Sequence, residues 1–262
     1  MISSTESLAD RVDLYHVLTL DFPSANAAEF ASTLGFDAIA IDFEHGKPDW
    51  ETAQNMVRAC ELSGTTAIGR IVPSAESVAA CLDIGITTLQ LAQVDSMEDV
   101  ETVLRRTRFA PRGSRGIGRA RANRFGHYPG GYTNFAGTAE SVRLIVHIET
   151  LAGVENLPEI VSVDQVDVIV VGAQDLAASL GHLGDSNHAE VRSTIEQVCE
   201  TVLASGKAIG MSASTPEDAR AAHARGARLV LSSQARLMST AASALLAVVS
   251  APDPINREGA SS

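Results

Sequence analysis

The stretch G-F-D-A-I-A-I-D-F-E-H-G (residues 35–46) decides the fold. An apolar run rich in isoleucine leads directly into Asp42, Glu44 and His45. A short run of this kind is typical of a parallel strand that is covered on both faces. Polar groups placed directly after such a strand lie at its carboxyl end, which is the catalytic side of many α/β folds. Further runs of the same type lie on both sides of this stretch.

Apolar runs that predict strands recur along the chain, and each is followed by a segment with the helical spacing of alanine and leucine. Alternating strands and helices require a parallel sheet, and eight such units close into a barrel. The 262 residues are close to the roughly 250 of a typical (β/α)₈ domain. We predict an α/β fold with a single (β/α)₈ TIM barrel over residues 1–250, of which 1–13 form an N-terminal extension, and a disordered tail at 251–262. The predicted strands are at residues 14–20, 36–42, 65–72, 86–92, 142–148, 166–171, 207–212 and 228–232.

An open, doubly wound sheet is the alternative. The turn after the first strand, L-D-F-P-S, offers no G-x-G-x-x-G for a dinucleotide, and the lone G-x-G at Gly116 and Gly118 lies outside any strand-to-helix turn. Both points favour the barrel.

Charge and composition indicate the class of partner. A net charge of -12 argues against nucleic acid and anionic membranes, which would repel the protein. No apolar run approaches the roughly 18 residues of a membrane span, and the first residues lack a signal pattern, so we expect a cytoplasmic protein with a small-molecule ligand. Cys60, Cys81 and Cys199 form no C-x-x-C pair and are expected to be buried apolar residues.

A long segment at residues 112–138, rich in arginine and glycine, interrupts the repeat. Long segments of this kind in compact domains are often functional. Its place after the fourth strand predicts a loop over the carboxyl face that covers substrate or contacts another subunit. A solvated basic loop is the alternative.

Glu149 and Asp175 follow neighbouring strands. Two carboxylates in one barrel mouth repel each other unless a proton or cation separates them, and Mg²⁺ or Mn²⁺ suits oxygen ligands. By strand alternation His147 faces the same side as Glu149. The alternative makes Glu149 a first-turn helix acid and Asp175 a helix N-cap.

His45, with Asp42 and Glu44 nearby, is a candidate general base near neutral pH, although a lone histidine is often only a structural hydrogen-bonding group. Arg70 ends an apolar strand, where a buried guanidinium needs an anion such as a substrate carboxylate. The alternative for Arg70 is an internal salt bridge to Asp42 or Glu44.

Only two lysines are present, so a Schiff-base mechanism has few candidates. Lys207 begins its strand, at the face opposite to catalysis. Lys47 lies in a polar loop, where the sequence shows no feature that would activate it as a nucleophile. Metal-assisted enolate chemistry is therefore preferred.

Several motifs, in order over about residues 14–235, resemble the metal-dependent, class II 2-oxo acid aldolases of the HpcH/HpaI type. They are G-F-D-A-I-A-I-D-F-E-H-G, G-R-I-V, L-D-I-G, A-P-R-G-S-R-G-I-G-R-A, I-E-T-L-A-G-V-E-N-L-P-E-I, D-V-I-V-V-G-A-Q-D-L-A-A-S-L-G and G-K-A-I-G. The resemblance implies a barrel that exchanges a C-terminal helix between subunits and a hexamer built as a trimer of dimers.

The resemblance also implies residue roles. Glu149 and Asp175 would hold a divalent metal, Mg²⁺, Mn²⁺ or Co²⁺, that chelates pyruvate. Arg70 would polarise the keto oxygen, and His45 would act in proton transfer. Supporting groups would be Asp42 and Asp83 beside His45, and Gly172, Ala173 and Gln174 at the substrate carboxylate, with His147 nearby.

Three positions depart from the family pattern. Ala92-Gln93 and Ala173-Gln174 stand where prolines are usual, and His147 replaces a glutamine near the metal. Gln93 and Gln174 add side-chain amides, so we expect that the substrates differ from pyruvate and a simple aldehyde.

We therefore expect a lyase that reversibly cleaves a 4-hydroxy-2-oxo acid to pyruvate, or a related 2-oxo acid, and an aldehyde. The alternative is a decarboxylase or carbon–carbon bond-forming synthase that acts on oxaloacetate or citrate-like acids. A non-catalytic relative that binds a 2-oxo acid is a third possibility, which retention of the polar residues disfavours.

Overall fold

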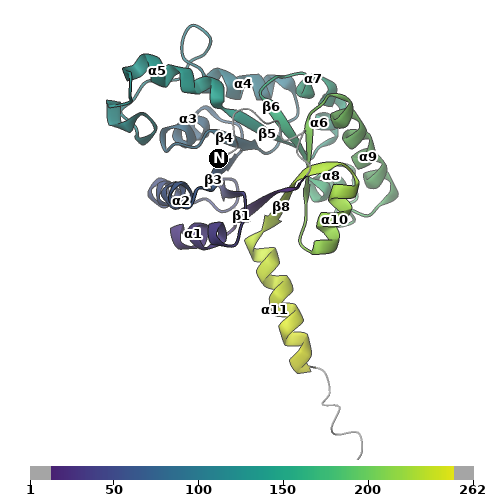
Figure 1. The fold of residues 1–262 in the computed structure, drawn as a ribbon. Helices are drawn as coiled ribbons and strands as arrows, with labels where there is room; N and C mark the ends of the chain where they lie inside the picture. The colour runs from purple at the N-terminus through teal and green to yellow at the C-terminus, as the bar shows by residue number, and fades with distance from the viewer. Residues whose placement is uncertain (1–12, 251–262) are drawn as a thin grey trace, which may run out of the picture.

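The computed structural model describes residues 13–250, and these form a closed barrel of eight parallel strands with helices outside (Figure 1). Each strand pairs with its neighbours in sequence, and β8 pairs with β1 to close the barrel. The predicted fold class is confirmed. The strands are β1 (Tyr15–Leu20), β2 (Ala38–Asp42), β3 (Thr66–Ile71), β4 (Thr88–Leu91), β5 (Arg143–Ile148), β6 (Val166–Val171), β7 (Ala208–Ser212) and β8 (Ala227–Ser233).

Helices connect the strands and surround the barrel. Most begin at a polar cap; for example, the Ser24 and Thr215 side chains accept from backbone N–H groups in the first turn. The helices are α1 (Ala25–Thr33), α2 (Trp50–Ser63), α3 (Ala75–Asp83), α4 (Met97–Thr107), η2 (Arg121–Gly126), α5 (Gly131–Gly137), η3 (Thr138–Ser141), α6 (Leu151–Glu155), α7 (Leu157–Val161), α8 (Ala173–Ser179), α9 (Ala189–Ala204), α10 (Pro216–Ala224) and α11 (Gln234–Ser250).

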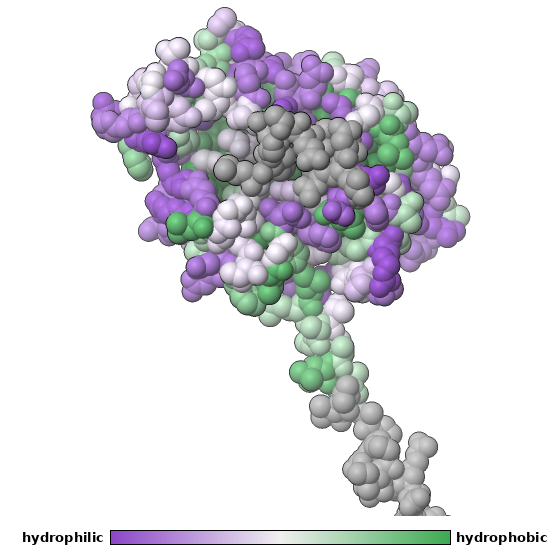
Figure 2. Space-filling model, viewed as in Figure 1, coloured by the Kyte–Doolittle hydropathy of each residue, from purple (hydrophilic) through white to green (hydrophobic). Residues whose placement is uncertain are grey.

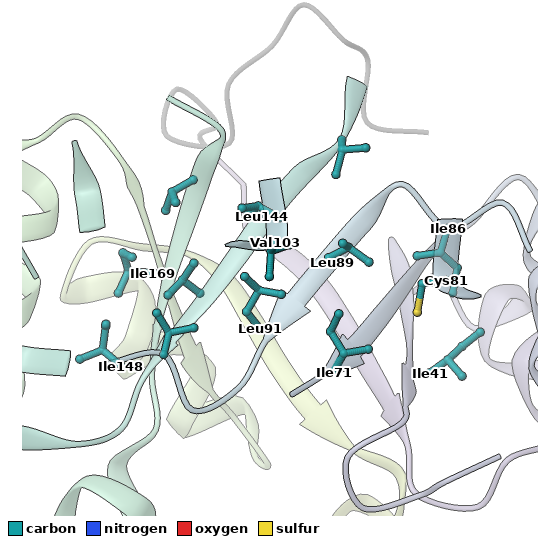
Figure 3. Packing of buried hydrophobic residues seen from close by; sticks show 14 of the residues in the cluster. Ile41, Ile71, Cys81, Ile86, Leu89, Leu91, Val103, Leu144, Ile148 and Ile169 are labelled. Carbon is teal, nitrogen blue, oxygen red and sulfur yellow. The ribbon is translucent and has the colours of Figure 1, made fainter. Parts of the chain in front are cut away.

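Strand alternation divides the apolar residues into two cores. Small and branched residues such as Ala40 and Val170 fill the barrel interior. Ile41, Leu89 and their equivalents on other strands face the helices instead and form the larger outer core (Figure 3). The same alternation fixes which polar residues near the strand ends point inward.

The three cysteines are buried, as expected. Burial, together with the charge of the neighbouring Glu61, raises the pKa of Cys60 to about 12. Burial also raises the pKa of Cys81 to about 12. These thiols therefore stay protonated at neutral pH and are packing residues, not nucleophiles.

The prediction for residues 112–138 was wrong about the face of the barrel. Helix α4 directly follows β4, so the segment joins the end of α4 to the start of β5, on the amino-terminal side. There Arg121 pairs with Glu61 at the end of α2 and donates to the Ile84 carbonyl oxygen after α3. The segment includes η2, α5 and η3 and braces the outer helices, away from the carboxyl ends of the strands.

Helix α11 leaves the barrel after β8 and projects from it (Figures 1 and 2). Its residues Met238 and Leu245 are 59% and 70% exposed in the single chain. None of the helices in residues 13–250 combines the length and apolarity needed to cross a membrane. Exchange of α11 between subunits stays a prediction, and the predictions for residues 1–12 and 251–262 lie outside the described residues.

Candidate active site

The carboxylate of Asp42 organises the loop after β2. Its Oδ1 atom accepts hydrogen bonds from the backbone N–H groups of Glu44, at 2.9 Å, and His45, at 3.1 Å. The loop then folds back so tightly that a Cβ atom on Gly46 would lie 2.8 Å from the Asp42 carbonyl oxygen. A side chain does not fit there, so glycine allows the turn that places Glu44 and His45 at the barrel mouth.

Arg70 lies beside Asp42 because β2 and β3 pair with these two residues in register. Its Nη1 atom is 3.4 Å from Asp42 Oδ2, and its Nη2 atom is 2.5 Å from Glu44 Oε2. The internal salt bridge that was the alternative for Arg70 is thus formed, with both Asp42 and Glu44. The Nε atom of Arg70 is buried and has no hydrogen-bond partner within residues 13–250. The guanidinium is therefore fixed at the site by two anions, and its buried Nε–H donor is unused.

Glu149 is buried just beyond β5. Its Oε1 atom accepts the backbone N–H of Gln93 at 2.7 Å. Gln93 adopts a φ of 55°, which is uncommon for a residue with a side chain, and its amide Nε2 donates to Glu44 Oε1 at 3.1 Å. Gln93 thereby connects the Arg70 ion pairs to Glu149.

His147 is buried one inward position below Glu149, as alternation predicted. Its Nδ1 atom is 3.6 Å from Glu149 Oε2, and its Nε2 atom is 2.7 Å from Gln90 Nε2. Sequence reasoning missed Gln90. Its neighbours Leu89 and Leu91 belong to the outer core, so the alternation of β4 was the signal that this glutamine points into the barrel.

The environment of Glu149 favours its charged form. Burial alone would raise its pKa, but the hydrogen bond and charge of His147, the Gln93 N–H and the charge of Arg70 together lower it. Glu149 is therefore an anion at neutral pH, as a metal ligand must be.

Asp175 lies in the first turn of α8 and is exposed. The N-cap position of this helix is Gly172, so the alternative that made Asp175 the cap is wrong. Gly172 packs directly against Glu149: a Cβ atom there would lie 2.9 Å from Glu149 Oε2. The Gly172 N–H donates to the Ile148 carbonyl oxygen, and Gln174 Nε2 donates to Ser186 Oγ at 3.0 Å.

Two predicted residues lie apart from this group. The His45 side chain is 72% exposed, and its Nε2 atom is 3.6 Å from Glu44 Oε2; Asp42 holds its backbone and not its ring. Asp83 ends α3, at the amino-terminal side of the barrel. Burial raises its pKa by more than the charge of Arg115 lowers it. Within one chain the structure does not bring Asp83 to His45.

The residues present fit a hard divalent cation. Glu149 is anionic, and its Oε2 atom lies beside Gly172, which has no side chain. Asp175 comes three residues after Gly172 in the chain. Two carboxylates supply the oxygen ligands that Mg²⁺ or Mn²⁺ prefers. The two predicted metal residues therefore have the chemistry that such an ion requires, and their joint binding of a metal stays a prediction.

The family model described as HpcH/HpaI aldolase/citrate lyase matches residues 18–234. The chain belongs to this family. The match includes every residue of the site described above, so the family and the polar network coincide in the same part of the chain.

The proteins that are similar to this chain include enzymes of different specificity. The hydroxypyruvate/pyruvate aldolase of Cupriavidus necator is 35% identical over 78% of this chain and 76% of its own. The 2-keto-3-deoxy-L-rhamnonate aldolase of Klebsiella pneumoniae is 35% identical over 81% and 80%. The crystal structure of the citrate synthase SbnG is 26% identical to this chain and superposes with a TM-score of 0.79. The similarity covers 93% of this chain and 97% of SbnG.

Proposed function

We propose that this protein is a metal-dependent aldolase that reversibly cleaves a 4-hydroxy-2-oxo acid to pyruvate, or a related 2-oxo acid, and an aldehyde. The observation that carries the proposal is the continuous polar network from Asp42 through Arg70, Glu44 and Gln93 to Glu149 at the carboxyl ends of four successive strands. Barrel enzymes place their catalytic groups at these strand ends. Aldolases among the relatives support the reaction class.

The reaction needs a base for the hydroxyl proton and a stabiliser for the charge that follows. His45 takes the proton from the C4 hydroxyl, the C3–C4 bond breaks, and the aldehyde leaves. The bond electrons become an enolate, whose charge gathers on the 2-oxo oxygen. Arg70 stabilises that oxygen because its guanidinium is fixed in place before the reaction begins. A proton delivered to C3 then completes the 2-oxo acid.

Glu149 and Asp175 would hold the metal, Mg²⁺, Mn²⁺ or Co²⁺. The ion would supply Lewis-acid stabilisation of the same developing charge. The chain's part is to keep Glu149 ionised and oriented, through Gln93 and His147, and to leave space beside it at Gly172. The backbone N–H groups of Ala173 and Gln174, at the start of α8, suit the substrate carboxylate.

A synthase or decarboxylase that acts on oxaloacetate or citrate-like acids is the second candidate. The similarity to a citrate synthase over nearly the whole chain favours keeping it. Both reactions use an enolate, so the same arginine and carboxylates would serve either of them. The difference lies in the electrophile and not in the enolate site.

Product analysis separates the two candidates. Metal-loaded protein is incubated with pyruvate and a panel of aldehydes, and separately with oxaloacetate alone. The proposal expects 4-hydroxy-2-oxo acids from the first mixture, reversible on dilution. Decarboxylation or condensation of oxaloacetate without any aldol product would favour the second candidate. Borohydride added with pyruvate should leave the mass of Lys47 unchanged, and an adduct there would contradict metal-assisted chemistry.

A further inference from the structure

The loop between α8 and α9 gathers two histidines and a glutamate. His182 Nε2 is 2.8 Å from Glu190 Oε2, and the rings of His182 and His188 stack with their centroids 3.5 Å apart. One ligand atom from each of the three residues lies within 4.8 Å of the others. Within residues 13–250, no other group of three or more His, Cys, Asp or Glu residues meets this condition.

This cluster is separate from the catalytic network. It contains none of the residues between Asp42 and Asp175 that form the network, and its ligands come from the loop and from the first turn of α9. A side-chain hydrogen bond connects the two regions, from Gln174 Nε2 to Ser186 Oγ in the same loop. Both imidazoles are partly buried and Glu190 is exposed, so an ion reaches the cluster directly from solvent.

Backbone hydrogen bonds hold the loop in place. The His182 N–H donates to the Ala177 carbonyl oxygen, the Asp185 N–H to that of His182, and the His188 N–H to that of Asp185. His188 also caps α9, because its Nδ1 atom accepts the Glu190 N–H at 3.3 Å. A ligand that binds here loses little free energy to ordering the chain.

The ligand types indicate the class of ion. Imidazole nitrogens suit Zn²⁺ and similar transition metals, whereas Mg²⁺ prefers oxygen and retains its water. Two histidines and one glutamate are a known zinc ligand set, with the fourth position taken by water. We propose that His182, His188 and Glu190 form a second metal site, specific for a Zn²⁺-like dication, that ties the α8–α9 loop to the start of α9.

Zinc titration in a protein that lacks the catalytic carboxylates tests the site by itself. Metal-free protein without a histidine tag, carrying Glu149→Gln and Asp175→Asn, is titrated with Zn²⁺ by calorimetry. We expect one Zn²⁺ per chain and no heat with Mg²⁺. His182→Gln and His188→Asn together should weaken Zn²⁺ binding by at least about tenfold. A loss of about that size already follows when a group that only orients a metal ligand is removed. Asparagine keeps a cap at the start of α9.

His223→Gln is the matched control, because it removes an exposed histidine from the last turn of α10. Its Zn²⁺ affinity should not change. Zn²⁺ should also raise the melting temperature of the parent and not that of the double-histidine variant. Absence of Zn²⁺ binding in the parent, or equal binding in the double-histidine variant, overturns the proposal. If that variant fails to fold, unchanged affinity in the surface variant Glu190→Gln overturns it.

Discussion

Arg70 and His45 differ in how firmly the protein holds them. Arg70 is fixed between Asp42 and Glu44 with 18% of its side chain exposed, whereas the His45 ring is 72% exposed. A fixed cation suits stabilisation of charge at one point, and an exposed imidazole suits proton exchange with a substrate that enters from solvent. The two residues should therefore affect different steps.

Arg70→Lys keeps the charge but loses the planar fork that contacts both acids. We expect aldol cleavage and exchange of the pyruvate methyl protons to fall together, by about 10² or more, on the scale of one lost oxyanion donor. His45→Ala should lower cleavage by roughly 10² to 10⁴ while methyl exchange falls less. Both rates are measured by NMR. Equal loss of both reactions in both variants would mean that the two residues act as one unit.

Gly172 tests the placement of Glu149 without changing any charged group. Gly172→Ala puts a Cβ atom 2.8 Å from Glu149 Cβ and 2.9 Å from its Oε2 atom, so the carboxylate has to move. We expect Mg²⁺ affinity, measured by calorimetry, to fall about 10-fold or more, as when a group that orients a ligand is lost. Gly137→Ala, where no atom lies within 4 Å of the new Cβ, is the control. Unchanged affinity in Gly172→Ala would separate Glu149 from the metal.

At the scale of elements, register turns sequence pattern into a site. Asp42 pairs with Arg70 across β2 and β3, and alternation points both inward. The sequence predicts the strand positions because apolar runs recur regularly along it. It also predicts Asp42, Arg70 and Glu149, because each is a charged residue at the end of an apolar run. Asp83 and the face of segment 112–138 were not, because they depend on where each helix ends and on which side the chain returns.

The role of Gln93 was also hidden from the sequence. Its φ of 55° and its two hydrogen bonds, one through the backbone and one through the side chain, follow from the path of the loop after β4. No pattern of residue types specifies such a conformation. Sequence reasoning identified Gln93 as an additional amide but not as the link between Glu44 and Glu149.

Packing inside the barrel depends on a small residue in β7. A Cβ atom on Gly210 would lie 2.7 Å from Val170 Cγ2 and 3.2 Å from Leu229 Cδ2. Gly210→Ala should lower the free energy of unfolding by roughly 1–3 kcal/mol, as overpacking of a core does. Urea denaturation measures it. The Val170→Ala change should cost less in the Gly210→Ala background than alone, and strict additivity would contradict this packing.

At the scale of the whole molecule, α11 is the least covered element, with the apolar side chains of Met238 and Leu245 exposed in the single chain. We propose that it packs against other copies in a homo-oligomer, a hexamer as the family resemblance implies. Leu245→Glu should shift the mass measured by light scattering to smaller species, because burying a charge costs more than the contact gains. Exposed Leu62→Glu, at 90% exposure in α2, is the control. A wild-type monomer would contradict the proposal.

Exchange of the pyruvate methyl protons in D₂O tests the central claim most directly, because it requires the enolate and no acceptor. The wild-type protein should lose exchange after exhaustive chelation and regain it with Mg²⁺, whereas Glu149→Gln with Asp175→Asn should not regain it. Glu159→Gln with Asp164→Asn, which removes two exposed carboxylates near the end of α7, should behave as wild type. Full exchange by the chelated Glu149→Gln, Asp175→Asn protein would contradict the account.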